Sequence, residues 1–493
     1  MMATDRGQSM RSKRLSSGVG GMLWERRAGS VCALLLLVSG CATFDQRAGF
    51  SDVSTAVEAR SGKRLVWNLG TDLDAKAAQD VRGLLARRLT ADGAIQVALL
   101  NNRELQAMYA ELGVAQADLV QAGLLANPVF DGAIFFPVAG GPATLDLSVA
   151  LSFLDIFYRP LRTRVAAARF EDAKLQLTGA VLDFAAMVRA AFYRHQANEQ
   201  RIELLETVVQ ALAVSFDVTE RLYAAGNITD LDRARERAQL EEAKLQLRAA
   251  EVAVRESWAR LNTVMGLWGE ETAWHIERRL PDLPAEPLSV AGLEGQALRQ
   301  SLDLASARQR LIVAGEQLGV RRAMLFIPES SLGAEAEREE GEWKVGPSIE
   351  VPIPLLDQGQ GRLGRAAAEF RRAQQEYYAL GVRLRSTARL VKERLQGAED
   401  RARYSRDIVL PLRERIVRET QWQYNAMQLG VFELLRAREQ QLQAALAYVD
   451  TLLDYWLART DLEQLLSGRV PRLEGMTTSR GERPGNMAEH AGR

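Results

Sequence analysis

The chain has very few of the side chains on which most enzymes rely. Cys32 and Cys41 are its two cysteines, and His195, His275 and His490 are its three histidines among 493 residues. Both cysteines lie near the N-terminus and the histidines are scattered, so neither a disulfide framework nor a thiolate or histidine metal site is expected. The sequence also lacks a phosphate-binding loop and a nucleophile elbow. We therefore expect a protein that is not an enzyme and that has no cofactor and no metal site.

An excess of one charge is also missing, because 63 Lys and Arg residues balance 63 Asp and Glu residues. Proteins that bind nucleic acid usually carry a basic excess, so no nucleic-acid partner is expected. Aromatic residues make up only 6% of the chain. This composition suits long helices that pack through alanine and leucine better than it suits the core of a globular enzyme.

The first forty residues have the layout of a secretory signal. Basic residues precede an apolar run, 31–38, that is too short to span a bilayer, and small residues then precede Cys41. The sequence Val38-Ser39-Gly40-Cys41 resembles a bacterial lipobox, in which the cysteine is lipidated and becomes the first residue of the mature protein. We predict a lipoprotein signal peptide at 1–40 and lipidation at Cys41. The alternative is an ordinary signal peptide followed by a chance cysteine.

The rest of the chain contains one pattern twice. We place the two copies at 94–267 and 293–467, with a linker at 268–292. A repeat of this length indicates a duplicated half of one domain and not the unit of a solenoid. The segment 41–93 precedes the first copy, and the tail 468–493, rich in glycine, arginine and serine, is predicted to be disordered.

Long helices are predicted in both copies. Residues 161–223 contain no proline, and a helix over this range would be about 95 Å long. The stretch 361–427 is similar but contains Pro411, where we expect a kink or a break. A single helix is expected over 94–125, ending before Asn127-Pro128. In each copy the two shorter helices together nearly match the long one in length, so they can stack end to end beside it.

Short strands are predicted between these helices, near 129–153 and 331–353. In the first pair, nine residues alternate between apolar and small or polar side chains. This is the pattern of a tilted transmembrane barrel strand, although a half-buried strand of a soluble sheet alternates in the same way. The residues predicted to face lipid are Leu145, Leu147, Val149, Leu151 and Phe153.

The second pair is less regular. We expect a short strand over 331–336, an acidic turn over 337–340, and a second strand that Pro347 and Pro352 shorten or bulge. Four strands in two distant pairs are too few for a soluble sandwich or for a barrel made by one chain. The protomer must therefore complete its sheet by assembly.

Several short motifs, in their order, spacing and duplication, resemble those of the TolC family of bacterial outer-membrane efflux proteins. The resemblance covers about residues 89–466 and is greatest to the lipoprotein members of the family. The motifs are Ala98-Leu99-Leu100-Asn101-Asn102, Gly113-Val114-Ala115 leading to Asn127-Pro128, Pro352-Ile353-Pro354-Leu355-Leu356-Asp357, and the turns Tyr223-Ala224-Ala225-Gly226 and Leu429-Gly430-Val431-Phe432-Glu433-Leu434.

The resemblance implies a mainly α protein with a small β part. Duplicated long α-helical hairpins would form a periplasmic tunnel, and two β-hairpins would contribute four strands to a trimeric transmembrane β-barrel. It also implies a homotrimer in the lipids of the outer membrane, serving as the passive exit duct of a tripartite efflux or type I secretion system. Its partners would be a periplasmic adaptor protein and an inner-membrane transporter.

A periplasmic adaptor-like or structural coiled-coil lipoprotein without a pore is the alternative. An adaptor would have one helical hairpin flanked by β-rich modules, whereas here two hairpins alternate with two strand pairs. The sequence does not indicate whether the substrate is a drug, a dye, a metal or a protein.

The two turns farthest from the strands are the expected adaptor-contact tips. Gly226 and Gly430 are predicted to take the left-handed conformation that ends a helix, and either Asn227 or Thr229 to cap the next one. The apolar residues of these turns are expected to be exposed and to dock another protein. The tip residues are Gly226, Asn227, Ile228, Thr229, Gly430, Val431 and Phe432.

The resemblance also implies a gate at the tips, often made of acidic residues. Glu433 is the candidate, together with Asp230 beside the other turn. Three like carboxylates around one axis would repel one another and attract cations. The alternative is that each acid lies in solvent at the start of a helix, where the helix dipole favours a negative charge.

Overall fold

The computed structural model describes residues 45–138, 140–286, 288, 290–326, 330–339, 341–353 and 355–473. Cys41 and the predicted signal peptide lie outside the described residues. The chain divides into two units, Met1–Asp45 and Gln46–Arg493. All elements below belong to the second unit.

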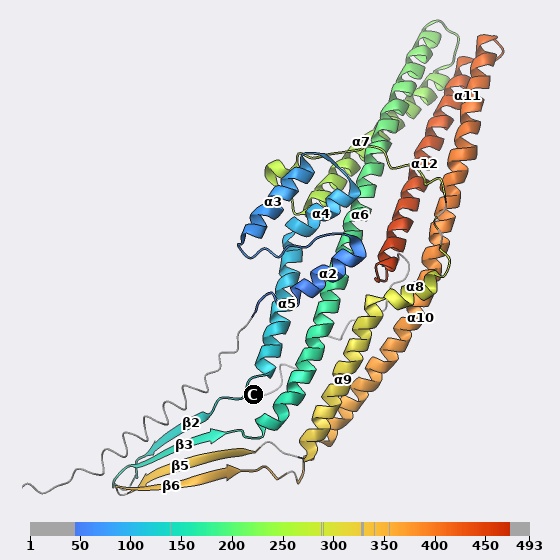
Figure 1. The fold of residues 1–493 in the computed structure, drawn as a ribbon. Helices are drawn as coiled ribbons and strands as arrows, with labels where there is room; N and C mark the ends of the chain where they lie inside the picture. Colours follow the sequence, from blue (N-terminus) through green and yellow to red (C-terminus); the bar gives the residue numbers. More distant parts are fainter. Residues whose placement is uncertain are drawn as a thin grey trace, which may run out of the picture. The chain divides into compact units, whose positions relative to one another are not determined.

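The duplication predicted from the sequence is present in the order of the elements (Figure 1). Each copy runs helix, helix, strand, strand, and then two long helical segments. The first copy comprises α4 (Ala91–Asn101), α5 (Arg103–Ala122), β2 (Val129–Phe135), β3 (Thr144–Leu151), α6 (Asp155–Ala224) and α7 (Asp230–Met265). The second comprises α8 (Leu293–Gln300), α9 (Leu302–Phe326), β5 (Ser331–Glu339), β6 (Glu342–Glu350), α10 (Gln360–Tyr404), the π-helical turn η2 (Ser405–Val409), α11 (Leu410–Asn425) and α12 (Val431–Leu466).

Smaller elements precede and join the two copies. The N-terminal segment contributes α2 (Phe50–Ser61) and α3 (Asp72–Leu85). The linker contributes the 3-10 turn η1 (Gly269–Thr272) and β4 (His275–Ile276), and β4 pairs in parallel with β1 (Arg88–Leu89). The linker also packs into the core, where Trp274 is buried and its indole N–H donates to Asn262 Oδ1 at 2.7 Å.

The predicted single helix over 94–125 is wrong, because the chain breaks at Asn102 into α4 and α5. Asn102 is extended, its side-chain oxygen accepts from Leu105 N–H at 3.0 Å, and its amide donates to Val264 O at 3.0 Å. The side chain therefore caps α5 and holds the end of α7 at the same time. The second copy breaks in the same place, at Ser301 between α8 and α9.

The end-to-end stacking of shorter helices is confirmed in both copies. The 20 residues of α5 and the 36 residues of α7 both pack along the 70 residues of α6. Likewise α9 and α12 pack along α10, and α12 continues along α11. The break expected at Pro411 is present as η2, whose π turn absorbs the hydrogen bond that proline cannot donate.

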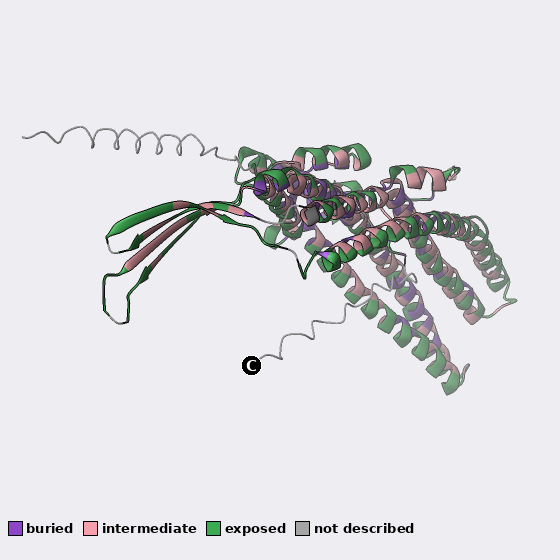
Figure 2. Cartoon of the chain, turned by 90° about the horizontal axis from the view of Figure 1, so that it is seen from below, coloured by how far each residue is buried: buried purple, intermediate pink, exposed green. Residues whose placement is uncertain are grey.

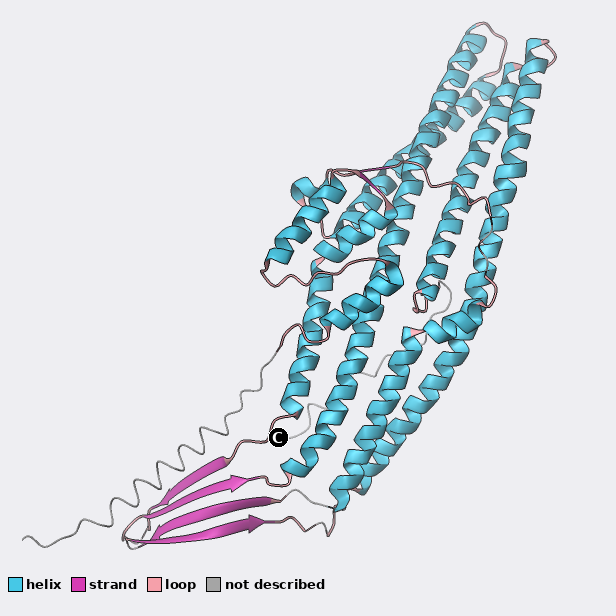
Figure 3. Cartoon of the chain, in the orientation of Figure 1, coloured by secondary structure: helices cyan, strands magenta, loops and turns pink. Residues whose placement is uncertain are grey.

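The four strands form one antiparallel sheet in the order β2-β3-β5-β6 (Figure 3). The expected acidic turn over 337–340 is wrong in part, because β5 continues to Glu339 and pairs with both neighbours almost to its end. The proline-rich partner is shortened as predicted: β6 ends at Glu350, before Pro352. Within the described residues, the outer edges of β2 and β6 have no partner strand.

The apolar core follows the helices and not the sheet. Buried residues run along α4, α6, α10 and α12, whereas the strands are exposed or half-buried (Figure 2). On α10 the side chains of Leu384, Ala388 and Val391 are buried, and those of Phe370 and Tyr377 are half-buried. Of the described helices, α6 is the one long and apolar enough to cross a membrane by composition, and half of its most apolar window is buried within the chain, as in a core helix.

Candidate functional site

The sheet has one apolar face. Across the strands, Phe130 lies opposite Val149, which lies opposite Ala334 and then Pro347. Successive side chains on a strand point to opposite faces, so alternate residues share this one. Most of its large side chains are exposed, Val345 at 75% and Ile349 at 68%. An exposed apolar sheet face of this kind is suited to lipid.

The predicted lipid-facing residues Leu145, Leu147, Val149 and Leu151 all belong to this apolar face. Phe153 follows the end of β3 and lies in the turn before α6, so it is not part of the strand. The contact of these residues with lipid stays a prediction.

The opposite face of the sheet is strongly acidic, a feature that the sequence did not predict for β5 and β6. One row across the four strands reads Asp131, Ser148, Glu335 and Gly346, and the next reads Ala133, Asp146, Glu337 and Lys344. In the described strands Lys344 is the one basic residue on this face. The acids on it are Asp131, Asp146, Glu335, Glu337, Glu339, Glu342 and Glu350.

The turn between α6 and α7 forms largely as predicted. Gly226 has φ 72° and ends α6, while Asn227 N–H donates back to Leu222 O at 2.9 Å. Thr229 is the residue that caps α7, with its hydroxyl oxygen accepting from Asp232 N–H at 3.2 Å. A left-handed glycine followed by this back-bond is the usual way to end a helix.

The turn between α11 and α12 differs from the prediction. Gly430 is extended, with φ −78°, and precedes α12, whereas Met427 takes the left-handed conformation with φ 57°. The reason is the back-bond from Gln428 N–H to Gln423 O at 2.9 Å, which places the left-handed residue three positions before the glycine. Met427 is 94% exposed.

The apolar tip residues are less exposed than expected. Ile228, Val431 and Phe432 are each half-buried, so their apolar character is explained in part by packing within the turns. The exposed large apolar side chains near the tips include Met427 at 94% and Leu231 at 58%.

The candidate gate residues each lie in the first turn of a helix. Glu433 accepts from Arg436 at 3.4 Å, and Asp230 accepts from Arg233 at 3.1 Å. Both acids are exposed. This local pairing is what the alternative, a solvated acid at a helix start, predicts, and the gate stays a hypothesis.

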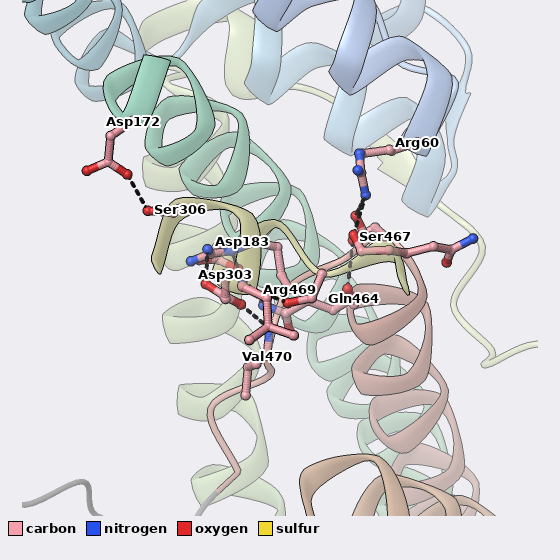
Figure 4. A network of polar contacts seen from close by, with 12 residues as sticks. Arg60, Asp172, Asp183, Asp303, Ser306, Gln464, Ser467, Arg469 and Val470 are labelled. Carbon is pink, nitrogen blue, oxygen red and sulfur yellow. Dashed lines mark hydrogen bonds and ion pairs between the residues drawn. The ribbon is translucent and has the colours of Figure 1, made fainter. Parts of the chain in front are cut away.

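A polar junction joins the two copies where α12 ends. The Arg469 guanidinium lies between Asp183 of α6 and Asp303 of α9 and pairs with both, its Nε donating to Asp183 Oδ1 at 3.0 Å (Figure 4). Val470 N–H donates to Asp303 at 2.9 Å. Burial raises the pKa of Asp303, and the charge of Asp183 adds to this while Arg469 opposes it.

Arg60 of α2 extends this junction to the N-terminal segment. Its guanidinium donates to Ser467 O at 2.7 Å, at the end of α12, and to Gln300 O at 3.0 Å, at the end of α8. A cation at two helix C-termini is favoured by both helix dipoles. The junction therefore ties α2, α6, α8, α9 and α12 at one place.

His195 is packed within the helical core. It is 2% exposed, its Nδ1 lies 2.9 Å from Ser257 Oγ, and its ring meets Trp274 edge-on. Burial lowers the pKa of His195 to about 4. In the part of the chain that the structure describes, His, Cys, Asp and Glu residues form no group able to hold a metal ion.

Comparison with known proteins gives one consistent result. The family model for outer membrane efflux proteins matches residues 94–267, the first copy of the repeat. The cobalt-zinc-cadmium resistance protein CzcC of Cupriavidus metallidurans is 24% identical over 387 residues, which is 77% of this chain and 90% of that protein. The probable efflux pump outer membrane protein TtgC of Pseudomonas putida is 25% identical over 221 residues, 42% of this chain and 45% of that protein.

Solved structures share the fold. The outer membrane protein VceC of Vibrio cholerae superimposes with a TM-score of 0.61 at 20% identity, over 77% of this chain and 96% of that one. The outer membrane channel CmeC of Campylobacter jejuni gives a TM-score of 0.63 at 16% identity, over 77% of this chain and 86% of that one.

Proposed function

The chain belongs to the family of outer membrane efflux proteins, and from that premise we propose that it acts as a homotrimer, the passive exit duct of a three-part pump. Its location is the outer membrane, and its role is that of an efflux channel. The family members are channels and not enzymes. The trimer, the anchor, the partners and the substrate below are the proposal.

The trimer is supported by the two sides of the protomer. On each side, both the sheet and the helical part far from it lack a neighbour in the part of the chain that the structure describes. The sheet ends in β2 on one side and β6 on the other, and both outer edges lack a partner within the described residues. Unpaired strand edges are not tolerated in lipid, so a spanning sheet must close. Three copies of four strands give a closed barrel of twelve.

The helices repeat this arrangement farther from the strands. There the neighbours run α7, α6, α12, α11, so α7 and α11 are the two flanks. Leu245 and Val252 are exposed one heptad apart on α7, and Ile408 and Leu412 are exposed four residues apart along η2 and α11. A head-to-tail ring would cover both apolar flanks at once.

Engineered cysteines test this contact. Cys32 and Cys41 are the only native cysteines, so a Leu245→Cys, Leu412→Cys variant should form disulfides between copies and give covalent trimers on a non-reducing gel. Glu256→Cys with Leu412→Cys is the matched control, since position 256 lies about three turns farther along α7. If the Leu245→Cys, Leu412→Cys variant also stays monomeric under oxidation, the ring is refuted.

We propose that the tips receive the periplasmic adaptor, whose inner-membrane transporter supplies the energy. Phe432→Ser and Ile228→Ser should preserve trimers and abolish efflux. Because both residues are half-buried, Met427→Ser and Leu231→Ser are the cleaner variants, since these side chains are exposed. Wild-type efflux in all four variants would place docking elsewhere.

We propose that Cys41 carries the lipid anchor. Cys41→Ser should yield an unmodified mature chain that is held less firmly, although the assembled barrel would still retain it. Intact mass of the wild-type protein should show an acylated chain that starts at Cys41.

We propose divalent metal cations as the substrate. Two observations support this: the similarity to CzcC, named for cobalt, zinc and cadmium resistance, and the acidic face of the sheet, which would line the barrel if the apolar face meets lipid. Deletion of the gene should sensitise cells to these metals and not to organic drugs. The reverse pattern would exclude a metal substrate.

A further inference from the structure

The four helices next to the sheet enclose a groove of about 980 Å³. It is lined by residues of α5, α6, α9 and α10 and of the segment that follows α5. Asp155, the first residue of α6, lines it, and β3 ends only four residues earlier. The groove therefore lies where the strands meet the helices.

The groove carries a positive excess. Five arginines line it against three acids, Asp118, Asp155 and Glu369. The arginines come from three helices: Arg162 and Arg169 from α6, Arg321 from α9, and Arg362 and Arg365 from α10.

Three of these arginines have acidic partners. Arg162 pairs with Asp155 at 2.6 Å, Arg365 with Glu369 at 3.0 Å, and Arg362 with Asp357 at 3.2 Å. Asp155 is fully occupied, because it also accepts from Ala126 N–H at 3.0 Å. Burial alone would raise the pKa of Asp155, but these donors outweigh it and lower the pKa.

Arg169 and Arg321 are different. Within the described residues, Arg169 makes no hydrogen bond or ion pair, and the one contact of Arg321 is from its Nη1 to Met324 Sδ at 3.8 Å. Asp118 is the one groove acid that has no basic partner within the described residues, so the lining includes two unpaired guanidinium groups and one unpaired carboxylate. Beside them are the apolar side chains of Leu124, Leu125 and Met324.

We propose that this groove binds a phosphate-bearing ligand through Arg169 and Arg321. A planar guanidinium offers two parallel N–H donors that match two phosphate oxygens. Two such groups from different helices supply two positive charges, which can engage the oxygens of a phosphodiester or of a pyrophosphate. Leu124, Leu125 and Met324 supply an apolar wall for a ligand that also has a hydrocarbon part.

Two sources can supply this chemistry. If the strands cross the outer membrane, as the proposed function holds, the groove lies at the periplasmic border of that membrane and within reach of phospholipid headgroups. A soluble phosphate compound in the periplasm is the other source. All lining residues belong to one chain, so binding of the ligand does not depend on closure of the ring. A failure to bind is therefore distinguishable from a failure to form the proposed trimer.

The test is calorimetric titration of the full-length protein in detergent with inorganic pyrophosphate, and native mass spectrometry after mixing with phosphatidylglycerol. We expect saturable binding in at least one arm, and the double variant Arg169→Gln, Arg321→Gln should weaken it at least about tenfold, since both sets of charge-assisted hydrogen bonds to the phosphate are lost. Phosphatidylglycerol binding alone would identify a lipid site, and pyrophosphate binding alone a soluble ligand.

Arg164→Gln is the matched control, because Arg164 lies on the same helix, pairs with Glu316 at 3.6 Å and does not line the groove. Binding that is unchanged in the double variant, or weakened equally in the control, overturns the proposal. Absence of binding of both probes to the wild-type protein at millimolar concentration also overturns it. The melting temperature of the double variant shows whether it is folded. The titration of the wild-type protein tests the proposal independently of that variant.

Discussion

Gly468, at the end of α12, lies directly against the carbonyl oxygen of Gln300, at the end of α8. A Cβ at position 468 would overlap that oxygen, and Gly468 has φ 100°. Leu302 N–H donates to Gly468 O at 2.9 Å. The first copy has the same relationship, since Gly266, with φ 70°, would place a Cβ 3.0 Å from Asn102 Cα. In both copies a left-handed glycine lets a long helix end against the break between two shorter ones.

Gly468→Ala is therefore expected to destabilise the protein by more than about 2 kcal/mol, because left-handed strain adds to a clash with backbone that cannot move aside. Gly266→Ala should cost less, as its contacts are longer. The measurement is the melting temperature of the purified protein. Gly364→Ala in α10 is the control and should be neutral or stabilising, since nothing lies within 4 Å of its Cβ position. Equal melting temperatures for all three variants would contradict this explanation.

Arg469→Gln should destabilise the junction by about 2 kcal/mol at pH 7.5, because Asp183 and Asp303 would lose their shared cation while staying partly buried. Burial already raises the pKa of Asp303, and loss of Arg469 would raise it further. A carboxyl with a raised folded-state pKa costs stability when ionised, and that cost disappears as the pH falls. The loss of stability caused by Arg469→Gln, relative to the wild type, should accordingly be smaller at pH 5. A loss that grows on acidification would refute the explanation.

His195 is expected to make stability depend on pH. Burial lowers its pKa to about 4 from 6.5. Between these values the unfolded chain binds a proton that the folded chain does not, so stability is full above pH 6.5 and falls as the pH drops toward 4, by up to about 3 kcal/mol. His195→Gln should flatten the melting temperature over this range. The control is the substitution His275→Gln, at an exposed histidine. If the melting temperature of His195→Gln depends on pH as that of the wild type does, this role of His195 is excluded.

The two faces of β3 predict opposite responses to a charge. Val149→Arg should cost about 2–4 kcal/mol near the middle of the bilayer, whereas Ser148→Arg, on the acidic face, should be tolerated. Heat stability of the assembled protein in outer-membrane extracts measures both. Equal damage at the two positions would indicate a dry, soluble sheet.

The features that the sequence predicted are those fixed by local chemistry. The long helix α6, the break beside Pro411 and the cap at Thr229 each depend on residues close to one another in the chain. The period-two alternation of β3 is also local, and its apolar residues share one face as predicted.

The features that it missed depend on distant partners. Asn102 interrupts an otherwise continuous helical pattern because its amide also holds the end of α7, more than 160 residues away. In the sequence, the acids of β5 are typical of a solvated turn. They lie in a strand because β3 and β6 pair with β5 on its two sides. The left-handed position at Met427 follows from where α11 ends, which the glycine at 430 does not reveal. The groove arginines lie on three helices that only the fold brings together.

We propose that three copies of this chain close into one channel in the outer membrane. The most direct measurement is the native mass of the full-length protein extracted from outer membranes in a mild detergent. We predict a single species of three chains that resists dissociation until heated. A species of one chain under the same conditions would exclude the trimeric channel, because the strand edges of β2 and β6 would then have no partner in lipid.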